Sequence, residues 1–168
     1  MNDMKTYVLT LSRVFPASHR QTGKPTDFER KLRRADCRKL CPVETFCKED
    51  CTDGWRKIHT IRANYELWHR RFKEIEEGKA CLSVRQWSGE PYRSRQVELA
   101  KLTREDGIGI QKLEFGYYDQ CPYIGHNQIP VAKLSANDGL SYEDWCEWFK
   151  GYDLHKPMAI IHFTKFRY

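Results

Sequence analysis

The stretch WRKIHTIR, residues 55–62, is the part of the sequence that says most about the fold. Within residues 57–62 its two isoleucines can anchor a short segment to a core, and four polar side chains accompany them. A buried Lys57 would lose part of its hydration, so its pKa would fall and it could act as a base. The Thr60 hydroxyl beside it could then attack a substrate or orient a water. The alternative is that Lys57 and Arg62 are solvated and Thr60 is an ordinary strand residue, which this stretch alone favours.

Short strands are expected on both sides of this stretch, because runs rich in Val, Ile, Leu, Thr and aromatic residues alternate with turn residues. These strands cover residues 5–15, 79–87, 94–103 and 108–116, and a last one lies within 156–168. Helical spacing and capping residues predict helices at about 26–35, 65–77 and 141–149. Many short strands with few helices favour an α+β fold with a small barrel or curled sheet over a doubly wound α/β fold.

Length and composition indicate one folded domain. The chain has 168 residues and a mass of 20.0 kDa, and 40% of its residues are hydrophobic and 13% aromatic. Such a chain can bury a core and is too rich in aromatic residues for a disordered protein. No apolar run reaches the length of a membrane span, and residues 1–16 do not resemble a secretory signal. We therefore expect a cytoplasmic protein, with no membrane partner and with mostly reduced cysteines.

Positive charge is concentrated near the N-terminus. The formal net charge is +6, and residues 19–39 contain eight basic and three acidic side chains. A moderately basic surface favours polyanionic partners, nucleic acid first.

Four cysteines follow within fifteen residues, in the pattern Cys37-x3-Cys41-x5-Cys47-x3-Cys51. Four thiolates can hold one structural zinc ion, and such a site can fold a small segment that has no core of its own. The spacing differs from the common Cys-x2-Cys knuckle. Free thiols, disulfides and an iron–sulfur site therefore remain as alternatives.

Basic and aromatic side chains also gather in residues 85–95, RQWSGEPYRSR. Aromatic rings stack on bases, and arginine pairs with phosphate or stacks on a base. The residues of interest are Arg85, Trp87, Tyr92 and Arg93. The alternative is that Trp87 fills one end of the fold and the arginines are solvated.

WRKIHTIR resembles the Lys-x-x-Thr-Ile-Arg signature of ASCH domains, a branch of the PUA-like β-barrel superfamily. Residues 136–149, ANDGLSYEDWCEWF, resemble the family segment in which an acidic residue precedes a glycine and a short helix. Residues 156–166, KPMAIIHFTKF, resemble the closing strand. The resemblance covers roughly residues 54–168 and the first strand. It implies a single ASCH domain over 1–168, with a Cys-rich basic insertion at about 19–53.

The resemblance implies a small, closed or nearly closed β-barrel capped by helices. Lys57, Thr60 and an acidic residue, here Asp138, would meet in a cleft of this barrel. The superfamily is linked to RNA binding and modification, and some small bacterial ASCH proteins deacetylate N4-acetylcytidine with a Lys, a Thr and a Glu. Asp138 stands where those enzymes have Glu, so its carboxylate is one methylene shorter, and displacements of about 1 Å can cost about 10²-fold in rate.

Three functions therefore remain open. The first is a binding module for RNA or a modified nucleobase, with Lys57, Arg62, Arg85 and Arg93 as contacts. The second is an amidohydrolase for an N4-acylated cytidine, with Lys57, Thr60 and Asp138 in its active site. The third and weaker one is a protein-interaction adaptor. In a regular strand Lys57 and Thr60 would lie on opposite faces, so a shared site requires a bend between them.

Overall fold

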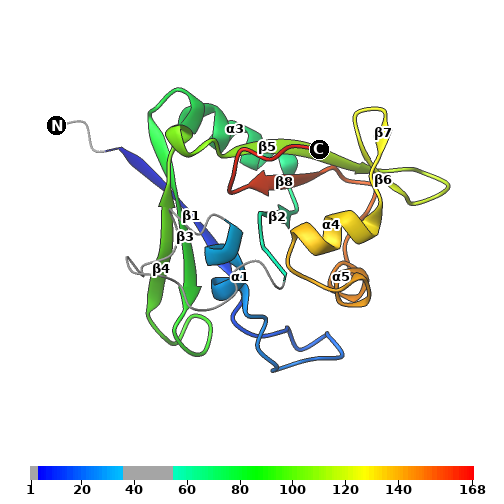
Figure 1. Cartoon of the computed structure of the whole chain (residues 1–168), viewed down its shortest axis with the longest axis horizontal. Coiled ribbons are helices and arrows are strands. Elements are labelled where there is room, and N and C mark those ends of the chain that lie inside the picture. The colour runs from blue at the N-terminus through cyan, green and yellow to red at the C-terminus, as the bar shows by residue number, and fades with distance from the viewer. Residues whose placement is uncertain (1–3, 36–54) are drawn as a thin grey trace.

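The structure is a computed structural model that describes residues 4–35 and 55–168 (Figure 1). It has an α+β fold, as expected. The strands are β1 (Lys5–Leu11), β2 (His59–Arg62), β3 (Ala80–Trp87), β4 (Gln96–Leu102), β5 (Gly109–Phe115), β6 (Pro122–Ile124), β7 (Asn127–Gln128) and β8 (Met158–His162). The helices are α1 (Phe28–Ala35), α3 (Tyr65–Glu76), α4 (Val131–Asn137), α5 (Tyr142–Trp148) and the short 3-10 helix η1 (Arg104–Asp106).

The strands form two sheets. The smaller has the order β1-β3-β4, with β1 parallel to β3 and β4 antiparallel to it. The larger has the order β2-β8-β5-β6-β7, and all its pairs are antiparallel. Within residues 4–35 and 55–168 no closed barrel is present, so the barrel itself stays a prediction.

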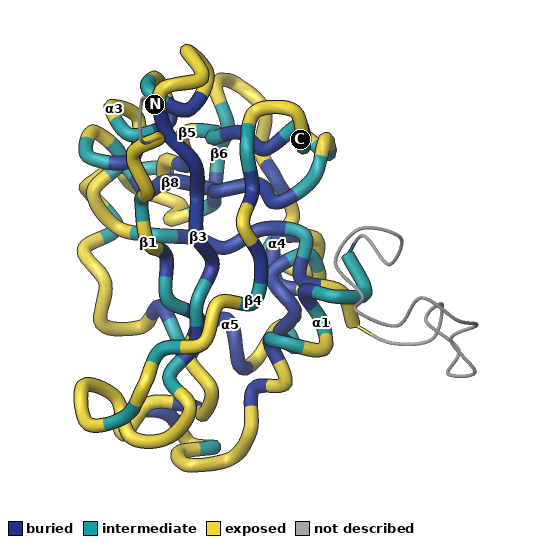
Figure 2. The backbone as a smooth tube through the Cα atoms, turned by 90° about the vertical axis from the view of Figure 1, so that its left-hand side faces the viewer, coloured by how far each residue is buried: buried dark blue, intermediate teal, exposed yellow. Residues whose placement is uncertain are grey.

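The core is built from the central strands of both sheets and from α3. β3 and β8 each lie between two neighbouring strands, and their residues are almost all buried (Figure 2). Helix α3 contacts β3 of the smaller sheet and β5 and β8 of the larger one. Trp68, Phe72 and Ile75 form its buried stripe, at the spacing expected of an amphipathic helix. The helix therefore packs against both sheets.

The N-terminal segment also contributes to the core. Phe28 and Leu32, one helical turn apart on α1, are both buried. The predicted insertion begins at residue 19, so its described part is packed into the domain. The four cysteines Cys37, Cys41, Cys47 and Cys51 lie outside the described residues.

No helix in the described ranges is long and apolar enough to cross a membrane.

Candidate functional site

Lys57 and Asp138 are held together by the backbone around them. They form an isolated antiparallel bridge, and the Ile58 amide donates a hydrogen bond to the carbonyl of Asn137 at 2.9 Å. The regular strand β2 begins only at His59, so Lys57 lies just before it, in the isolated bridge. Gly139 follows Asp138 with φ +77°, and a Cβ there would lie 3.3 Å from the Lys57 Cβ. The turn that brings the two residues together therefore requires glycine.

Their side chains form a buried ion pair. The Lys57 Nζ donates to the Asp138 Oδ1 at 2.5 Å and to the Asp138 carbonyl at 2.8 Å, and it lies 3.9 Å from the Phe28 ring centroid. Lys57 is 1% exposed and Asp138 3%. Burial lowers the pKa of Lys57, although the Asp138 carboxylate opposes this. Burial likewise raises the pKa of Asp138, although Lys57 opposes this.

The third residue of the predicted catalytic set is placed differently. Thr60 is buried on β2, where it pairs with Ile161 of β8. Its hydroxyl makes no hydrogen bond to another described residue. Lys57 and Asp138 are thus brought together as predicted, and Thr60 stands apart from their contacts.

His59, between Lys57 and Thr60 in the sequence, belongs to another cluster. Its Nε2 lies 2.6 Å from the Tyr168 hydroxyl, and its ring meets that of His162 edge-on at 5.6 Å. The His59 side chain therefore packs against His162 of β8 and against Tyr168.

Three of the predicted nucleic-acid contacts, Arg62, Trp87 and Tyr92, line a single groove of about 890 Å³, which we call the Arg62 groove. This volume is within the range of ligand sites in proteins, about 300–1,000 Å³. The loops that form it project from the lower edge of the molecule in Figure 1. The other lining residues come from Thr10–Ala17, from Thr22, Gly23 and Pro25, from the β3–β4 loop and from Gln96.

The floor of the Arg62 groove is organised by Thr10 on β1. The Arg62 Nη2 donates to the Thr10 carbonyl at 2.6 Å, and the Gln96 Nε2 donates to the Thr10 hydroxyl at 3.3 Å. Among the described residues no carboxylate lies within ion-pair distance of Arg62, and its buried Nε has no hydrogen-bond partner. Burial lowers the pKa of Arg62 below its usual value. The Asp138 carboxylate opposes this effect from beyond ion-pair distance, so the groove carries a cation without a described carboxylate in direct contact.

One wall of the groove is aromatic. The rings of Trp87 and Tyr92 lie 5.2 Å apart, and Tyr92 is 89% exposed. Tyr92 has φ +63°, a left-handed conformation that costs a non-glycine residue about 1–2 kcal/mol. Arg13 on the facing segment donates to the Ser88 carbonyl and so fastens that segment to the β3–β4 loop. A large ring is thus held out to solvent, on a strained backbone, beside the groove.

The other predicted contacts lie outside this groove. The Arg85 Nε donates to the Ser83 hydroxyl at 2.8 Å on β3. Arg93 is exposed and lies 3.6 Å from the Glu90 carboxylate. Within the described part of the chain no cluster of His, Cys, Asp and Glu could hold a metal ion. The four cysteines lie outside that part, so zinc bound to them stays a prediction.

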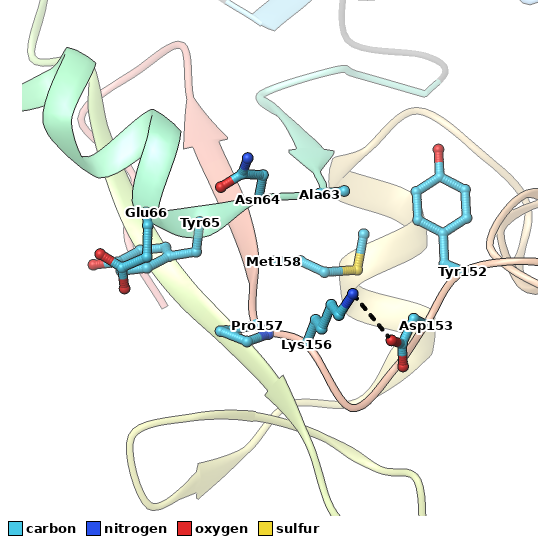
Figure 3. Close-up of a pocket in the computed structure, with 9 residues that line it drawn as sticks. All are labelled: Ala63, Asn64, Tyr65, Glu66, Tyr152, Asp153, Lys156, Pro157 and Met158. Atoms are coloured by element: carbon cyan, nitrogen blue, oxygen red, sulfur yellow. Dashed lines mark ion pairs between the residues drawn. The ribbon is translucent and has the colours of Figure 1, made fainter.

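A second pocket, of about 490 Å³, lies beyond the end of β2 (Figure 3). Tyr65 and Tyr152 stand on opposite sides of it, with Met158 between them. The Lys156 ammonium points to the Asp153 carboxylate at 3.7 Å. None of the predicted site residues lines this pocket.

In comparisons with known proteins, no family model, no curated protein and no solved structure matches this chain. Sequence reasoning missed Thr10, Gln96 and Phe28. Phe28 lies on a predicted helix, and its place over Lys57 depends on how that helix packs. Thr10 and Gln96 lie on predicted strands, and their meeting depends on the order β1-β3-β4.

Proposed function

We propose that this protein is a binding module that takes an unpaired RNA base or a modified nucleobase into the Arg62 groove. One observation carries the proposal: Arg62, Trp87 and Tyr92 line the same groove, and no described carboxylate pairs with Arg62. Aromatic rings give stacking surfaces for bases, and an arginine at the floor gives charged hydrogen-bond donors. The net charge of +6 supports a polyanionic partner. The ASCH relationship and a PUA-like barrel form part of this proposal, supported by the pairing of Lys57 with Asp138.

Binding is preferred over hydrolysis because Lys57 is buried and already paired with Asp138. Its ammonium contacts the Asp138 carboxylate, a backbone carbonyl and the Phe28 ring, and it is 1% exposed. A general base has to reach the proton that it removes, at about 2.6–3.2 Å or through one water. Lys57, Thr60 and Asp138 also do not line the Arg62 groove. In this arrangement the ion pair supports the fold beside the groove.

The proposal is tested by titrating a fluorescein-labelled, single-stranded eight-nucleotide RNA with the full chain at 50 and 200 mM salt. We expect affinity to fall steeply with salt, because each neutralised phosphate contributes about −0.7 to the slope of log K against log salt. Tyr92→Ala should weaken binding about tenfold, since stacking contributes about 1–3 kcal/mol per base. Arg62→Gln should also weaken it. Arg70→Gln, which removes an exposed arginine of α3, is the matched control for charge.

Two results would contradict this function. One is an affinity that Tyr92→Ala and Arg62→Gln change no more than Arg70→Gln does. The other is release of acetate from N4-acetylcytidine by the wild type, lost in Thr60→Val. That variant removes the hydroxyl but keeps the shape of the side chain, and the hydroxyl has no hydrogen bond to a described residue. Its loss of turnover would establish the amidohydrolase instead.

A further inference from the structure

The floor of the Arg62 groove offers a defined set of hydrogen-bonding groups. Thr10 binds one nitrogen of Arg62 through its carbonyl and the amide nitrogen of Gln96 through its hydroxyl. The Arg62 Nε is buried, so the remaining N–H groups on its two Nη atoms are the donors, and the Gln96 Oε1 is an acceptor. The side chains of Arg62 and Gln96 both line the groove, and Thr10 holds both of them in place. A ligand edge that presents an acceptor beside a donor would satisfy them.

The direction in which a base enters decides which atoms reach this floor. The groove is lined by apolar residues and prolines together with polar side chains, among them the Glu90 carboxylate, which disfavours a phosphate inside it. We therefore place the sugar–phosphate chain outside the groove. A base that enters edge-first therefore presents the atoms farthest from its glycosidic bond. In pyrimidines this is the group at position 4, and in purines the group at position 6. That group is a keto oxygen in uracil and guanine, and an amino group in cytosine and adenine.

Arginine distinguishes these two groups strongly. A guanidinium has only donors, so it binds a keto oxygen through a charge-assisted hydrogen bond and faces an amino group donor to donor. The ring N–H beside the keto oxygen, N3–H in uracil or N1–H in guanine, can donate to the Gln96 Oε1. Arg62 has no carboxylate at ion-pair distance among the described residues. An acceptor atom of the ligand would therefore also give the guanidinium a hydrogen-bond partner.

We infer that the Arg62 groove selects bases with a keto group at this edge, uracil and guanine, over cytosine and adenine. This inference rests on the proposed RNA-binding function. Trp87 and Tyr92 give affinity that is independent of the base, because every base has a stacking face. Arg62 and Gln96 give the selectivity.

The test uses two matched pairs of eight-nucleotide RNAs, oligo(U) against oligo(C) and oligo(I) against oligo(A). Inosine carries a keto oxygen where adenosine has an amino group, so stacking changes little within that pair. We expect the keto member of each pair to bind about tenfold more tightly, the usual discrimination of a well-placed arginine. Arg62→Lys keeps the charge but loses the planar set of donors, and should reduce the preference to about twofold or less. Tyr92→Ala should weaken all four RNAs alike and keep the preference.

Gln96→Met, at a partly buried position at the start of β4, keeps the inference testable if Arg62→Lys does not fold, and it should also reduce the preference. Equal affinity of the wild type within each pair would overturn the inference while leaving the proposed function in place. A preference unchanged in both Arg62→Lys and Gln96→Met would overturn it as well. Absence of binding to all four RNAs would overturn both the inference and the proposed function.

Discussion

His59 and His162 face each other across the pairing of β2 with β8, and both are fully buried. The Nε2 of His162 lies 2.9 Å from the Gln111 Oε1, and the Nε2 of His59 lies beside the Tyr168 hydroxyl. The Nδ1 atoms of both rings are buried without a hydrogen-bond partner in the described part of the chain. Burial lowers the pKa of His162 from 6.5 to about 3 and that of His59 well below its usual value. Both rings are therefore neutral in the folded protein near pH 7.

These two histidines should make stability fall in acid. Their pKa values are lower in the folded than in the unfolded chain, so the unfolded chain binds more protons below about pH 6.5. The contribution of His162 is complete above that pH and is lost as the pH falls toward about 3, and the contribution of His59 changes in the same direction. The free energy of unfolding, measured with urea at pH 7, 6, 5 and 4, should decline with falling pH. Each histidine should contribute up to about 1.4 kcal/mol per pH unit to this decline.

His162→Gln should remove one of these two contributions and make the decline between pH 6 and 4 shallower. His126→Gln, at an exposed position between β6 and β7, is the control and should leave the slope as it is. An identical slope in the wild type and in His162→Gln would show that His162 does not couple folding to protons.

At the scale of elements, the Lys57–Asp138 pair joins the segment before β2 to the end of α4. It does so through a backbone bridge, the Ile58–Asn137 hydrogen bond and the buried ion pair. The backbone amide of Lys57 also donates to the carbonyl of Lys31 on α1, at 3.0 Å. The Lys31 Nζ donates in turn to the carbonyl of Gly139 at 2.8 Å. Three separate segments therefore meet at this pair.

Breaking one side of the pair should be far costlier than replacing both. Lys57→Met or Asp138→Leu alone leaves an unpaired buried charge and should lower the free energy of unfolding by about 3–5 kcal/mol. The double variant replaces the pair with apolar side chains and should be more stable than either single variant. Lys156→Met, in the exposed Lys156–Asp153 pair, is the control and should change stability little. Additive losses in the double variant, measured by urea unfolding, would contradict this coupling.

Local pattern predicted most of the longer elements. The helix expected at 65–77 is α3 at Tyr65–Glu76, because its apolar spacing and its Asn64 cap are properties of neighbouring residues. The strands expected at 79–87 and 94–103 are β3 and β4. Helix α4 was missed, since seven residues that follow Pro130 carry little periodic signal. β2, β6 and β7 are four residues or fewer, too short for alternation to stand out.

The candidate site was predictable where one short segment carried the signal. Lys57 and Asp138 followed from the resemblance, and Trp87 and Tyr92 from an aromatic and basic loop. The position of Thr60 and the use of His59 in the Tyr168 cluster depend on where β2 begins, which strand alternation alone does not give. Which arginines face the groove also depends on the strand order. Arg62 therefore lines it, whereas Arg85 bonds to Ser83.

On the scale of the whole molecule, the two sheets share no strand among the described residues, and other contacts link them. Helix α3 packs against both, and the Arg62 hydrogen bond to Thr10 connects β2 of one sheet to β1 of the other. The single hydrophobic core includes residues of both sheets, among them Val84 and Ile160. We therefore expect the two sheets to unfold as one unit.

Hydrogen exchange can test this expectation directly. Amides of β3 and β8, the central strands, should exchange with the same free energy of opening, equal to that of global unfolding. The calorimetric and van't Hoff enthalpies should also agree. A β8 that opens at a markedly lower free energy than β3 would show two separately folding parts.

The strand order also bears on how the chain folds while it is synthesised. β8 is the second strand of the five-stranded sheet, and it pairs with β2 across about a hundred residues of sequence, His59 with His162. β1 similarly pairs in parallel with β3, Lys5 with Ala80. At about 5–20 residues per second, a ribosome needs roughly 5–20 seconds between making β2 and making β8. Through that interval β2 lacks β8, the one strand that it neighbours among the described residues, so the five-stranded sheet can be completed only when synthesis has nearly ended.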